Sequence, residues 1–546
     1  MIVDETQEKL AVWAQDPDHR FFDIYHLVYD EDWLYRAFLS VKSNSGSGTA
    51  GVDEETVEDF GENLQKNLKD LRKSLKSESY TPSPVRRTYI PKGDGRKRPL
   101  GIPTIRDRIV QEALRMILEP IYETDFSGSS YGFRPNRSTH DALTSVYQRL
   151  TPASPSYMPW VIDADIEGFF DNVDHRTLEQ IIQDRIEDQK IRDLVWKFLK
   201  AGYVEDGETH QTILGTPQGG IISPLLANVY LNELDQWVKQ WTDTSNNEKE
   251  KRRKRGKGNW QYVRYADDFL LMTNGKKGRA EWMMDKVGSF VSEELNLMLS
   301  DKKSELRHAE DGLSFLGYEL KAKTDTGGVK RKVPIEAIRD IKSKIRAGTE
   351  GAHEVSARRK IDRLNSVLKG WANYYKYATN AGRVFSDVEN YSWHRVTKWL
   401  ARKRKCSRKE LINQHLRSHS PITTGDVTLT QLRGFSDTWD RSPNRFRHPY
   451  LDGKMIHREK LPPENPSLAN QERRPGWSDA RWKAIKRGNF TCRNCGRNLE
   501  KVTIHVHHIS SYAGYDDHEE ANKVDNLVSL CRPCHQQIEK NREYAN

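Results

Sequence analysis

Two adjacent aspartates inside an apolar stretch constrain the fold of this chain more than any other feature. Val, Tyr, Phe and Leu flank Asp267 and Asp268 on both sides within residues 261–272. Residues of this kind favour β-strands, so we expect two strands that meet in a hairpin with the aspartates at its tip. Like charges this close repel each other, so a divalent cation between them is one explanation and an acidic, solvated turn is the other.

A second group of carboxylates lies earlier in the chain. Residues 159–173 begin with apolar residues typical of a buried strand and then carry Asp163 and Asp165. Side chains two apart on a strand share a face, so this strand and the hairpin tip can bring their carboxylates together. Carboxylates that hold two Mg²⁺ ions are what nucleotidyl transfer needs, because one ion activates a 3′-hydroxyl and the other holds the triphosphate.

Two further segments suit a substrate that carries phosphates. Residues 85–103 read as two short strands joined by a Gly-Asp-Gly turn, with Lys or Arg on both arms. Such a hairpin can grip phosphates, although a solvated basic hairpin has the same pattern. Residues 215–228 form a glycine-rich loop that runs into an apolar helix, and the N–H groups of such a loop can meet a phosphate or a base.

The composition indicates a polyanionic partner. The 546 residues suffice for several domains, and the net charge is +10 with a sequence pI of about 9.0 and a mean hydropathy of −0.83. We expect no membrane span and no secretory signal, because we find neither a run of 18 apolar residues nor an apolar segment at the N-terminus.

The region from about 335 to 404 has a helical and basic pattern. Aromatic residues are interspersed along it, namely Trp371, Tyr374, Tyr375, Tyr377, Tyr391, Trp393 and Trp399. We expect about half of them to be core residues and the surplus, with the positive charge, to favour RNA or DNA contact. Two smaller expectations are a flexible basic insertion at 248–257 and a short strand at 313–320.

The cysteines are clustered near the C-terminus. Four of the five form two Cys-x₂-Cys pairs, Cys492 with Cys495 and Cys531 with Cys534. Four thiolates at this spacing predict a closed structural zinc site in a reducing compartment. Because so small a unit can hardly bury its own core, we expect the metal to supply its folding free energy, roughly 10–16 kcal/mol for comparable sites.

Taken in order, these segments resemble reverse transcriptases, and group II intron-encoded proteins in particular. The resemblance covers about residues 50 to 320. It rests on the segments 96–103, 131–135, 165–175, 215–220, 265–268 and 315–318. It implies an α+β multidomain protein: a right-hand polymerase of fingers, palm and thumb, a helical maturase domain and a small ββα-metal HNH domain.

The resemblance also implies roles for individual residues of the polymerase. Asp165, Asp267 and Asp268 would be catalytic and would hold two Mg²⁺ ions, with Asp163 as the alternative on the same face. The other implied residues are Lys92 and Arg98 for the triphosphate, Phe170 against a 2′-hydroxyl, Gln218 beside the templating pair, and Phe315, Leu316 and Gly317 as the primer grip.

Residues among and after the cysteines resemble an HNH nuclease. In that resemblance His508 is the general base, and a His near its ordinary pKa is a competent base at neutral pH. His507 and His535 would bind one catalytic divalent ion, and Asn526 would hold the loop that orients His508. The alternative is a zinc ribbon that only clamps DNA and whose histidines are incidental.

The resemblance divides the chain into five parts. They are an N-terminal extension (1–60), fingers and palm (61–330), thumb and maturase domain (331–418), a DNA-binding connector (419–475) and an HNH endonuclease with zinc knuckles (476–546). Residues 370–375 resemble the family's maturase signature, which is less specific than the polymerase motifs.

The implied function combines an RNA-directed DNA polymerase, a splicing maturase and a site-specific DNA endonuclease. Its partners would be its own intron RNA, target DNA and dNTPs, and it would drive intron mobility by target-primed reverse transcription. We expect it in the bacterial cytoplasm, at the nucleoid when it acts on DNA, with an organelle as the alternative. Two rival functions are a maturase that only folds RNA and a reverse transcriptase of antiviral defence.

Overall fold

The computed structural model describes residues 3–44, 46–91, 97–212, 214–216, 219–351, 355–415, 421–437, 448–451, 477–488, 491–495, 504–509, 523–531 and 534. Three of the expected site residues, Lys92, Gln218 and His535, lie outside these ranges. The side chains of His507 and His508 also lie outside what the structure describes.

A four-stranded antiparallel sheet carries the expected catalytic aspartates. Its order is β6-β7-β3-β8, with β6 at Trp260–Tyr265, β7 at Asp268–Thr273, β3 at Trp160–Asp165 and β8 at Glu305–His308. The register places Asp165 opposite Asp268, and Asp163 lies between Leu270 and Glu305. The expected hairpin is confirmed, since β6 and β7 are joined at residues 266–267.

Both faces of this sheet are covered, because successive side chains of its strands point into different cores. Ile162 and Leu271 belong to one core, which α10 (Ser223–Thr242) and α12 (Lys277–Glu293) share. Val161 and Leu270 belong to a second core with α6 (Thr139–Leu150). This two-sided burial explains why the strands are almost continuously apolar up to the aspartates.

The expected fingers are built on a second four-stranded sheet and a long helix. The sheet order is β2-β1-β4-β5, with β1 at Val85–Pro91, β2 at Lys97–Ile102, β4 at Tyr203–Glu205 and β5 at Glu208–His210. Helix α5 (Ile105–Asp125) begins after Thr104, whose hydroxyl accepts a hydrogen bond from the Asp107 N–H. Three further helices follow β3 and precede β4 in the sequence. They are α7 (Phe169–Asn172), α8 (His175–Gln183) and α9 (Gln189–Lys200).

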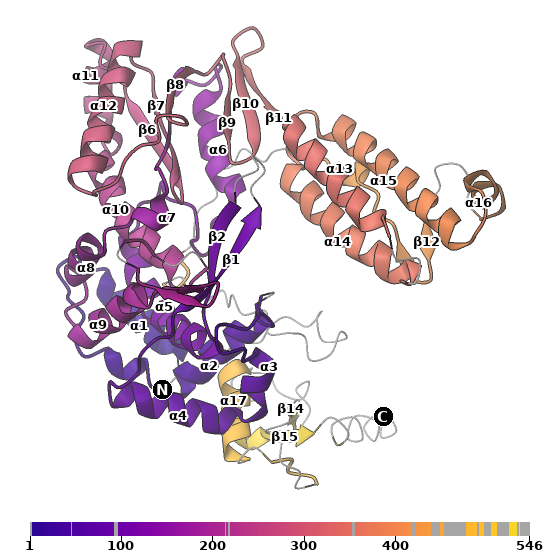
Figure 1. Ribbon diagram of the computed structural model, residues 1–546. Helices are drawn as coiled ribbons and strands as arrows, with labels where there is room; N and C mark the ends of the chain where they lie inside the picture. The colour runs from indigo at the N-terminus through magenta and orange to yellow at the C-terminus, as the bar shows by residue number, and fades with distance from the viewer. Residues whose placement is uncertain are drawn as a thin grey trace.

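The N-terminal residues are part of the same core as the fingers. Helices α1 (Val3–Ala14) and α2 (Glu31–Ser43) pack on α5, and α3 (Val57–Glu62) and α4 (Leu64–Lys76) follow. Buried side chains such as Val3, Trp33 and Phe60 join the core that contains the buried side of α5. The first 60 residues are therefore packed into the body of the protein (Figure 1).

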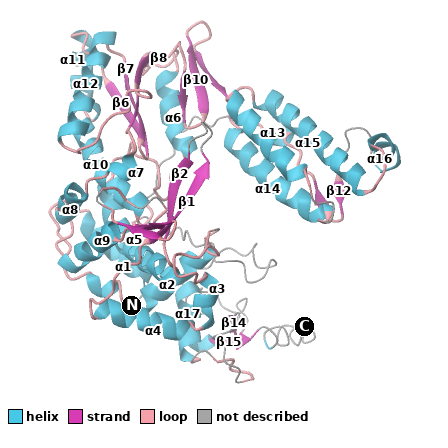
Figure 2. Cartoon of the chain, in the orientation of Figure 1, coloured by secondary structure: helices cyan, strands magenta, loops and turns pink. Residues whose placement is uncertain are grey.

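A helical unit projects to one side of the molecule, to the right in Figures 1 and 2. It follows the three-stranded sheet β11-β10-β9, with β9 at Leu313–Phe315, β10 at Tyr318–Lys323 and β11 at Gly328–Lys332. The unit consists of α13 (Ile335–Thr349), α14 (Ala357–Tyr375), α15 (Ala381–Lys403) and α16 (Arg408–His415). The helical pattern expected from 335 to 404 is therefore confirmed.

Two local expectations are wrong. Residues 313–320 are not one strand, because Leu316 and Gly317 have φ of +45° and +70° and turn the chain between β9 and β10. Residues 248–257 largely belong to helix α11 (Asn246–Lys254), whose first turn is capped by Ser245. Ion pairs between residues four apart, such as Arg252 with Glu248, favour this helix in spite of its charge.

The C-terminal unit contacts the N-terminal helices. Helix α17 (Trp477–Arg487) brings Ala484 and Ile485 into an apolar cluster with Tyr35 of α2. The hairpin of β14 (Ile504–His508) and β15 (Leu527–Cys531) lies beside α17 (Figure 1). Among the helices that the structure describes, none has the length and apolar character needed to cross a membrane.

Candidate active sites and metal centre

A buried arginine fixes the tip of the β6–β7 hairpin. Arg264 is fully buried, and its Nε and Nη2 atoms donate to the two carboxylate oxygens of Asp235 over 2.7 and 2.6 Å. Its Nη1 atom donates to Asn228 Oδ1 and to the backbone oxygen of Ala266, each over 3.0 Å. Ala266 has a φ of +57°, which residues with a Cβ rarely adopt, so these bonds hold an unfavourable turn in place.

A glycine brings a neighbouring loop against the same tip. A Cβ atom on Gly132 would lie 2.4 Å from the backbone nitrogen of Ala266, so only glycine fits there. The Gly132 carbonyl accepts a hydrogen bond from Asn228 Nδ2 over 2.9 Å, and the Tyr131 N–H donates to the Arg264 carbonyl over 2.9 Å. The loop of residues 131–135 therefore supports the hairpin.

The three aspartates at the tip repel one another. Burial raises the pKa of Asp268 to about 7, and the charges of Asp267 and Asp165 and a hydrogen bond with Asp165 add to this effect. Burial also raises the pKa of Asp267, while Arg98 and Lys303 act in the opposite direction. Closely spaced carboxylates with raised pKa values are the arrangement that a divalent cation stabilises.

The lysine that follows α12 forms an ion pair with one of these aspartates. Lys303 Nζ lies 2.8 Å from Asp165 Oδ2, and its side chain is about half exposed. Among the described residues, the aspartates are not a group whose ligand atoms all lie within 4.8 Å of one another. The site thus offers carboxylate oxygens, which Mg²⁺ prefers, together with an exposed ammonium group that an entering cation can displace.

Asp163 lies one pleat away from this cluster. With Arg307 and Asp311, it lines a cavity of about 450 Å³ between β3, β8 and the β9–β11 sheet. Burial raises the pKa of Asp163 to about 6, although the Arg307 charge opposes the shift. Its strand neighbours are Leu270 and Glu305, whereas Asp165 faces Asp268. This register favours Asp165 over Asp163 as a partner of the hairpin.

Two of the expected nucleotide-binding residues lie side by side. The guanidinium carbon of Arg98 is 6.0 Å from the ring centre of Phe170. Phe170 is 8% exposed and packs edge-on against Phe169. Its backbone oxygen accepts a hydrogen bond from the Thr216 N–H over 2.7 Å, which ties the glycine-rich loop to the ring. Lys92 and Gln218 lie outside the described residues.

The expected primer grip is anchored on the helical unit. Tyr374 of α14 donates a hydrogen bond to the Leu316 carbonyl over 2.6 Å, and Tyr318 donates back to the Tyr374 carbonyl over 2.5 Å. Phe315 is buried beside this turn. A Cβ atom on Gly317 would lie 3.4 Å from the Tyr375 hydroxyl oxygen. The segment 370–375 therefore joins the helical unit to the sheet.

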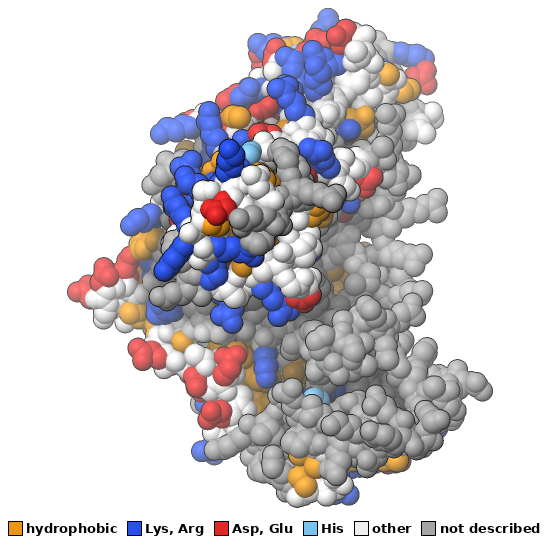
Figure 3. Space-filling view, turned by 90° about the vertical axis from the view of Figure 1, so that its right-hand side faces the viewer, with side chains coloured by type: hydrophobic (Ala, Val, Ile, Leu, Met, Phe, Trp, Pro, Cys, Tyr) orange, Lys and Arg blue, Asp and Glu red, His pale blue; other side chains and the backbone are white. Residues whose placement is uncertain are grey.

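The aromatic residues of the helical unit have mainly packing roles. Tyr375, Trp393 and Trp399 are buried, and the others named above are half-buried. Several carry a cation on one face, for example Lys360 over Trp399 at 4.7 Å. Lys and Arg side chains gather over the upper part of the face in Figure 3, which is the side of the projecting unit. Positive charge, more than exposed rings, is therefore what this unit offers to a nucleic acid.

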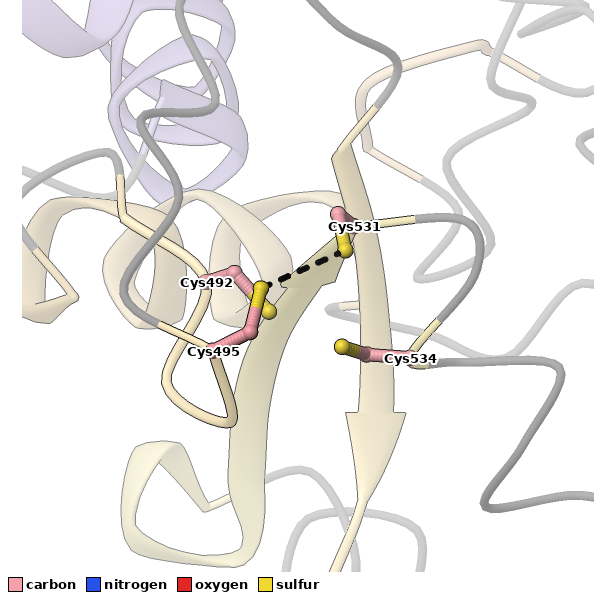
Figure 4. Close-up of side chains that lie close together, drawn as sticks. All are labelled: Cys492, Cys495, Cys531 and Cys534. Atoms are coloured by element: carbon pink, nitrogen blue, oxygen red, sulfur yellow. Dashed lines mark hydrogen bonds between the residues drawn. The ribbon is translucent and has the colours of Figure 1, made fainter.

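The four C-terminal cysteines converge on one point (Figure 4). Among the described residues they are the only set of three or more His, Cys, Asp or Glu whose ligand atoms all lie within 4.8 Å of one another. Cys495 Sγ and Cys531 Sγ are 3.8 Å apart, too far for a disulfide. Burial acts to raise the pKa of Cys492, but backbone N–H groups of Cys531, Cys495 and Asn494 lower it to about 6. This set is compatible with Zn²⁺.

Three of the expected nuclease residues, His507, His508 and Asn526, lie on or next to strands β14 and β15. His507 and His508 lie at the end of β14, opposite Val528 and Leu527 of β15. The backbone oxygen of Asn526 accepts a hydrogen bond from the Ile509 N–H over 2.7 Å. Asn526 therefore contacts the chain directly after His508, through its backbone.

Sequence reasoning missed the residues that support the sites. Arg264 immediately precedes the Tyr-Ala-Asp-Asp motif, but nothing in its spacing points to Asp235 on α10. Lys303 stands beside Lys302 and Asp301 in a short polar segment, which has no recognisable pattern. Only the packing of α10 behind β6 and the return of β8 beside β3 bring these side chains to the aspartates.

Three family models match successive parts of the chain. They are reverse transcriptase (RNA-dependent DNA polymerase) at residues 90–320, the group II intron maturase-specific domain at 338–417 and HNH endonuclease at 492–541. Reverse transcriptases and HNH nucleases generally use divalent metals. The chain therefore combines RNA-directed DNA polymerase and nuclease activities with a maturase domain, and this combination implies binding to intron RNA and DNA.

Individual relatives support the same assignment. The chain is 40% identical to protein YkfC of Escherichia coli over 61% of this chain and 92% of that protein. It is 26% identical to an uncharacterized 91 kDa protein in the cob intron of Schizosaccharomyces pombe, over 95% of this chain and 70% of that protein. It is 34% identical to the group II intron-encoded protein LtrA of Lactococcus lactis over 69% of this chain and 74% of that protein. The chain belongs to the family of group II intron-encoded proteins.

Proposed function

We propose that Asp165, Asp267 and Asp268 are the catalytic carboxylates of the polymerase and hold two Mg²⁺ ions. The observation that carries this proposal is the pairing of Asp165 with Asp268 across β3 and β7, together with the raised pKa of the Asp268 carboxyl. When bound, the ions would activate the primer 3′-hydroxyl and neutralise the triphosphate. The chain itself would hold the aspartates in register through Arg264.

The residues around the aspartates would bind and select the nucleotide. We infer that Arg98 and Lys92 bind the triphosphate and that Gln218 contacts the templating pair. Phe170 would lie beneath the sugar, where its ring leaves no room for a 2′-hydroxyl. The hydrogen bond from the Thr216 N–H to the Phe170 carbonyl supports this role, because it prevents the segment that carries the ring from moving away. Phe315, Leu316 and Gly317 would position the primer.

The C-terminal unit would supply the primer end. We infer that His508 is the general base of a DNA-nicking site, with His507 and His535 as ligands of one divalent ion and Asn526 as the support of the loop. The Cys₄ set would hold a structural Zn²⁺ that keeps the β14–β15 hairpin folded, because both hairpin ends lead to its cysteines.

These parts fit one pathway, target-primed reverse transcription. The protein would bind its own intron RNA through the basic helical unit and the connector would contact target DNA. The RNA would insert into one DNA strand, the nuclease would nick the other, and the freed 3′ end would prime DNA synthesis from dNTPs. The five parts of the chain would be the N-terminal extension (1–60), fingers and palm (61–330), thumb and maturase domain (331–418), DNA-binding connector (419–475) and HNH endonuclease (476–546). Since two of the relatives come from bacteria, we place this activity in the bacterial cytoplasm, at the nucleoid.

The experiment compares intact and pre-nicked target DNA. The full chain, assembled with its intron RNA, is incubated with target DNA, Mg²⁺ and dNTPs, and cDNA joined to the nicked strand is measured. We expect H508A to lose cDNA on intact DNA and to recover it on DNA that already carries the nick. We expect D268A to make no cDNA on either substrate while RNA splicing continues.

Two outcomes would contradict the proposal. Nicking by H508A at the wild-type rate would remove His508 as the general base. Equal loss of splicing and of cDNA synthesis in D268A would indicate that the aspartates serve RNA folding only, as expected for a maturase without polymerase activity. T209V, on the exposed strand β5, is the control for the effect of substitution itself.

A further inference from the structure

A second cavity lies between Phe170 and the sheet of the fingers. Its volume is about 310 Å³, at the lower end of the roughly 300–1,000 Å³ of small-ligand pockets. Residues of β1, β2 and β4 form one side, and the glycine-rich loop with Phe170 forms the other. We call it the side pocket and define it by Arg87, Tyr203, Phe170, Gly215 and Thr216.

Flat groups line one side of this pocket. The guanidinium carbon of Arg87 lies 3.5 Å above the ring centre of Tyr203, so the two planes are in contact. The Tyr203 ring in turn stacks on His210, with ring centres 4.9 Å apart and an angle of 20°. One face of the guanidinium is thus covered by the Tyr203 ring, and Arg87 lines the pocket. Guanidinium planes and aromatic rings are the groups on which proteins stack nucleobases.

Two buried polar atoms of the pocket residues have hydrogen-bonding capacity to spare. Thr216 is 3% exposed, and within the described part of the chain its Oγ1 atom has no hydrogen-bond partner. The same is true of Arg87 Nε. A buried hydroxyl or N–H without a partner costs about 1–3 kcal/mol, so a ligand with polar edges would relieve this cost. Nucleobases offer both a flat face and such edges.

Hydrogen bonds of Gly215 fix the wall of the side pocket beside Phe170. The Gly215 N–H donates to the Val173 carbonyl over 2.8 Å, and the Gly215 carbonyl lies 2.6 Å from His175 Nε2. A Cβ atom on Gly215 would lie 2.7 Å from the Phe170 carbonyl oxygen, and the φ of Gly215 is +89°. The loop therefore fits closely only as glycine and needs little rearrangement to receive a ligand.

We propose that the side pocket is a second nucleobase site of the polymerase, next to the site for the pairing nucleotide. The base would stack on Arg87 and receive hydrogen bonds from Thr216 and Arg87. Two sources share this chemistry: the template base ahead of the copied position, and the base of an incoming dNTP before it pairs. The proposal rests on the proposed polymerase function, since Phe170 borders both sites.

The test measures single-nucleotide addition to a DNA primer on an RNA template. The variants are R87K, which keeps the charge but loses the plane, and T216V, which keeps the shape but loses the hydroxyl. T216S, which restores the hydroxyl, is the rescue variant. R255K and T209V, on α11's C-terminal side and on β5, are the matched controls. Each protein is tested on an intact template and on one with an abasic residue just ahead of the copied base.

We expect R87K and T216V to lower kcat/KM about tenfold on the intact template, as loss of one stacked base contact predicts. If the template base is the ligand, the abasic template lowers the wild type to the level of the variants. If the dNTP is the ligand, the defect persists on the abasic template and arises from a raised KM for the dNTP. T216S restores the rate in either case.

Wild-type kinetics of both R87K and T216V on both templates would overturn the nucleobase site. That result differs from failure of the proposed polymerase function, in which the wild-type protein itself would not extend the primer. A defect in R255K as large as that in R87K would also contradict the site, because it would show that loss of any guanidinium group has this effect.

Discussion

At the scale of single residues, the tip of the β6–β7 hairpin combines two opposed requirements. Its aspartates must stay close to one another to hold cations, and their mutual repulsion and burial raise the pKa values of Asp267 and Asp268. Arg264, with its carboxylate partner Asp235, holds the turn from the side away from these charges. The aspartates that we propose as catalytic are therefore positioned by a buried ion pair, Arg264 with Asp235.

The first prediction concerns pH. The ordinary pKa of Asp268 is 3.8 and its folded value is about 7, so between these values the folded state binds more protons than the unfolded state. Its contribution to stability is therefore present at low pH and is lost as pH rises through about 7. We expect the metal-free protein to lose thermal stability from pH 5 to about 8, less steeply in D268N. Scanning calorimetry at several pH values, with and without Mg²⁺, measures this, and equal slopes for both proteins would contradict it.

The second prediction concerns Arg264. A lysine keeps the charge but cannot bond Asp235 with two N–H groups and also reach Asn228 and the Ala266 carbonyl. We expect R264K to lower kcat up to about 100-fold through misplacement of the aspartates, with KM for the dNTP little changed. R255K is the control. A kcat like that of the wild type in steady-state primer extension would show that the turn does not depend on this bond.

At the scale of elements, the C-terminal hairpin depends on its cysteines. Strands β14 and β15 have five residues each, and the described core around Cys492 and Cys531 is small. We expect removal of Zn²⁺ by a chelator to unfold this hairpin and abolish DNA nicking while primer extension continues. Circular dichroism and the two activity assays follow this loss. Nicking that survives complete zinc removal, confirmed by metal analysis, would contradict a structural role.

An element can be predicted from the sequence when neighbouring residues stabilise it. It cannot be predicted when residues far along the chain hold it in place. The hairpin at Asp267 and the helices of the projecting unit follow from local patterns of apolar residues. The turn at Leu316 and Gly317 does not, because its left-handed backbone is held by Tyr374, far along the chain. The helix of residues 246–254 was also missed, since side-chain ion pairs and a cap stabilise it without an apolar face.

The same limit applies to the candidate sites. The motifs at 96–103, 165–175 and 265–268 make the aspartates, Arg98 and Phe170 predictable as candidates, because each residue lies in a short characteristic segment. Lys303 and the partners of Arg264 come from other elements, so only the fold brings them together. The stack of Arg87 on Tyr203 is of this kind too, as it joins β1 to β4.

At the scale of the whole molecule, the nuclease unit lies against the N-terminal helices. Lys486 of α17 lies 2.8 Å from Glu31 and 3.6 Å from Asp32 of α2, beside an apolar contact through Ala484 and Ile485. After the helical unit, the connector touches α5, where the Tyr450 hydroxyl donates to Glu119 over 2.7 Å. The chain thus returns from the helical unit to the helices α5 and α2.

This arrangement predicts that charge at α17 controls docking of the nuclease unit. We expect K486E to increase hydrogen exchange in α17 and α2, since a partly exposed ion pair contributes about 0.2–1 kcal/mol and its reversal adds repulsion. The exchanged pair, K486E with E31K and D32K, should restore protection. Unchanged exchange in K486E would show that the apolar contact alone holds the unit.

The central claim is that Asp165, Asp267 and Asp268 form the polymerase site. Extension of a DNA primer on an RNA template, measured with Mg²⁺ over a range of concentrations, tests it most directly. We predict Mg²⁺-dependent cDNA from the wild type and a loss of at least about 1,000-fold in D165N, D267N and D268N, with D163N retaining activity. Extension by any of the three variants at a rate near that of the wild type would contradict the account.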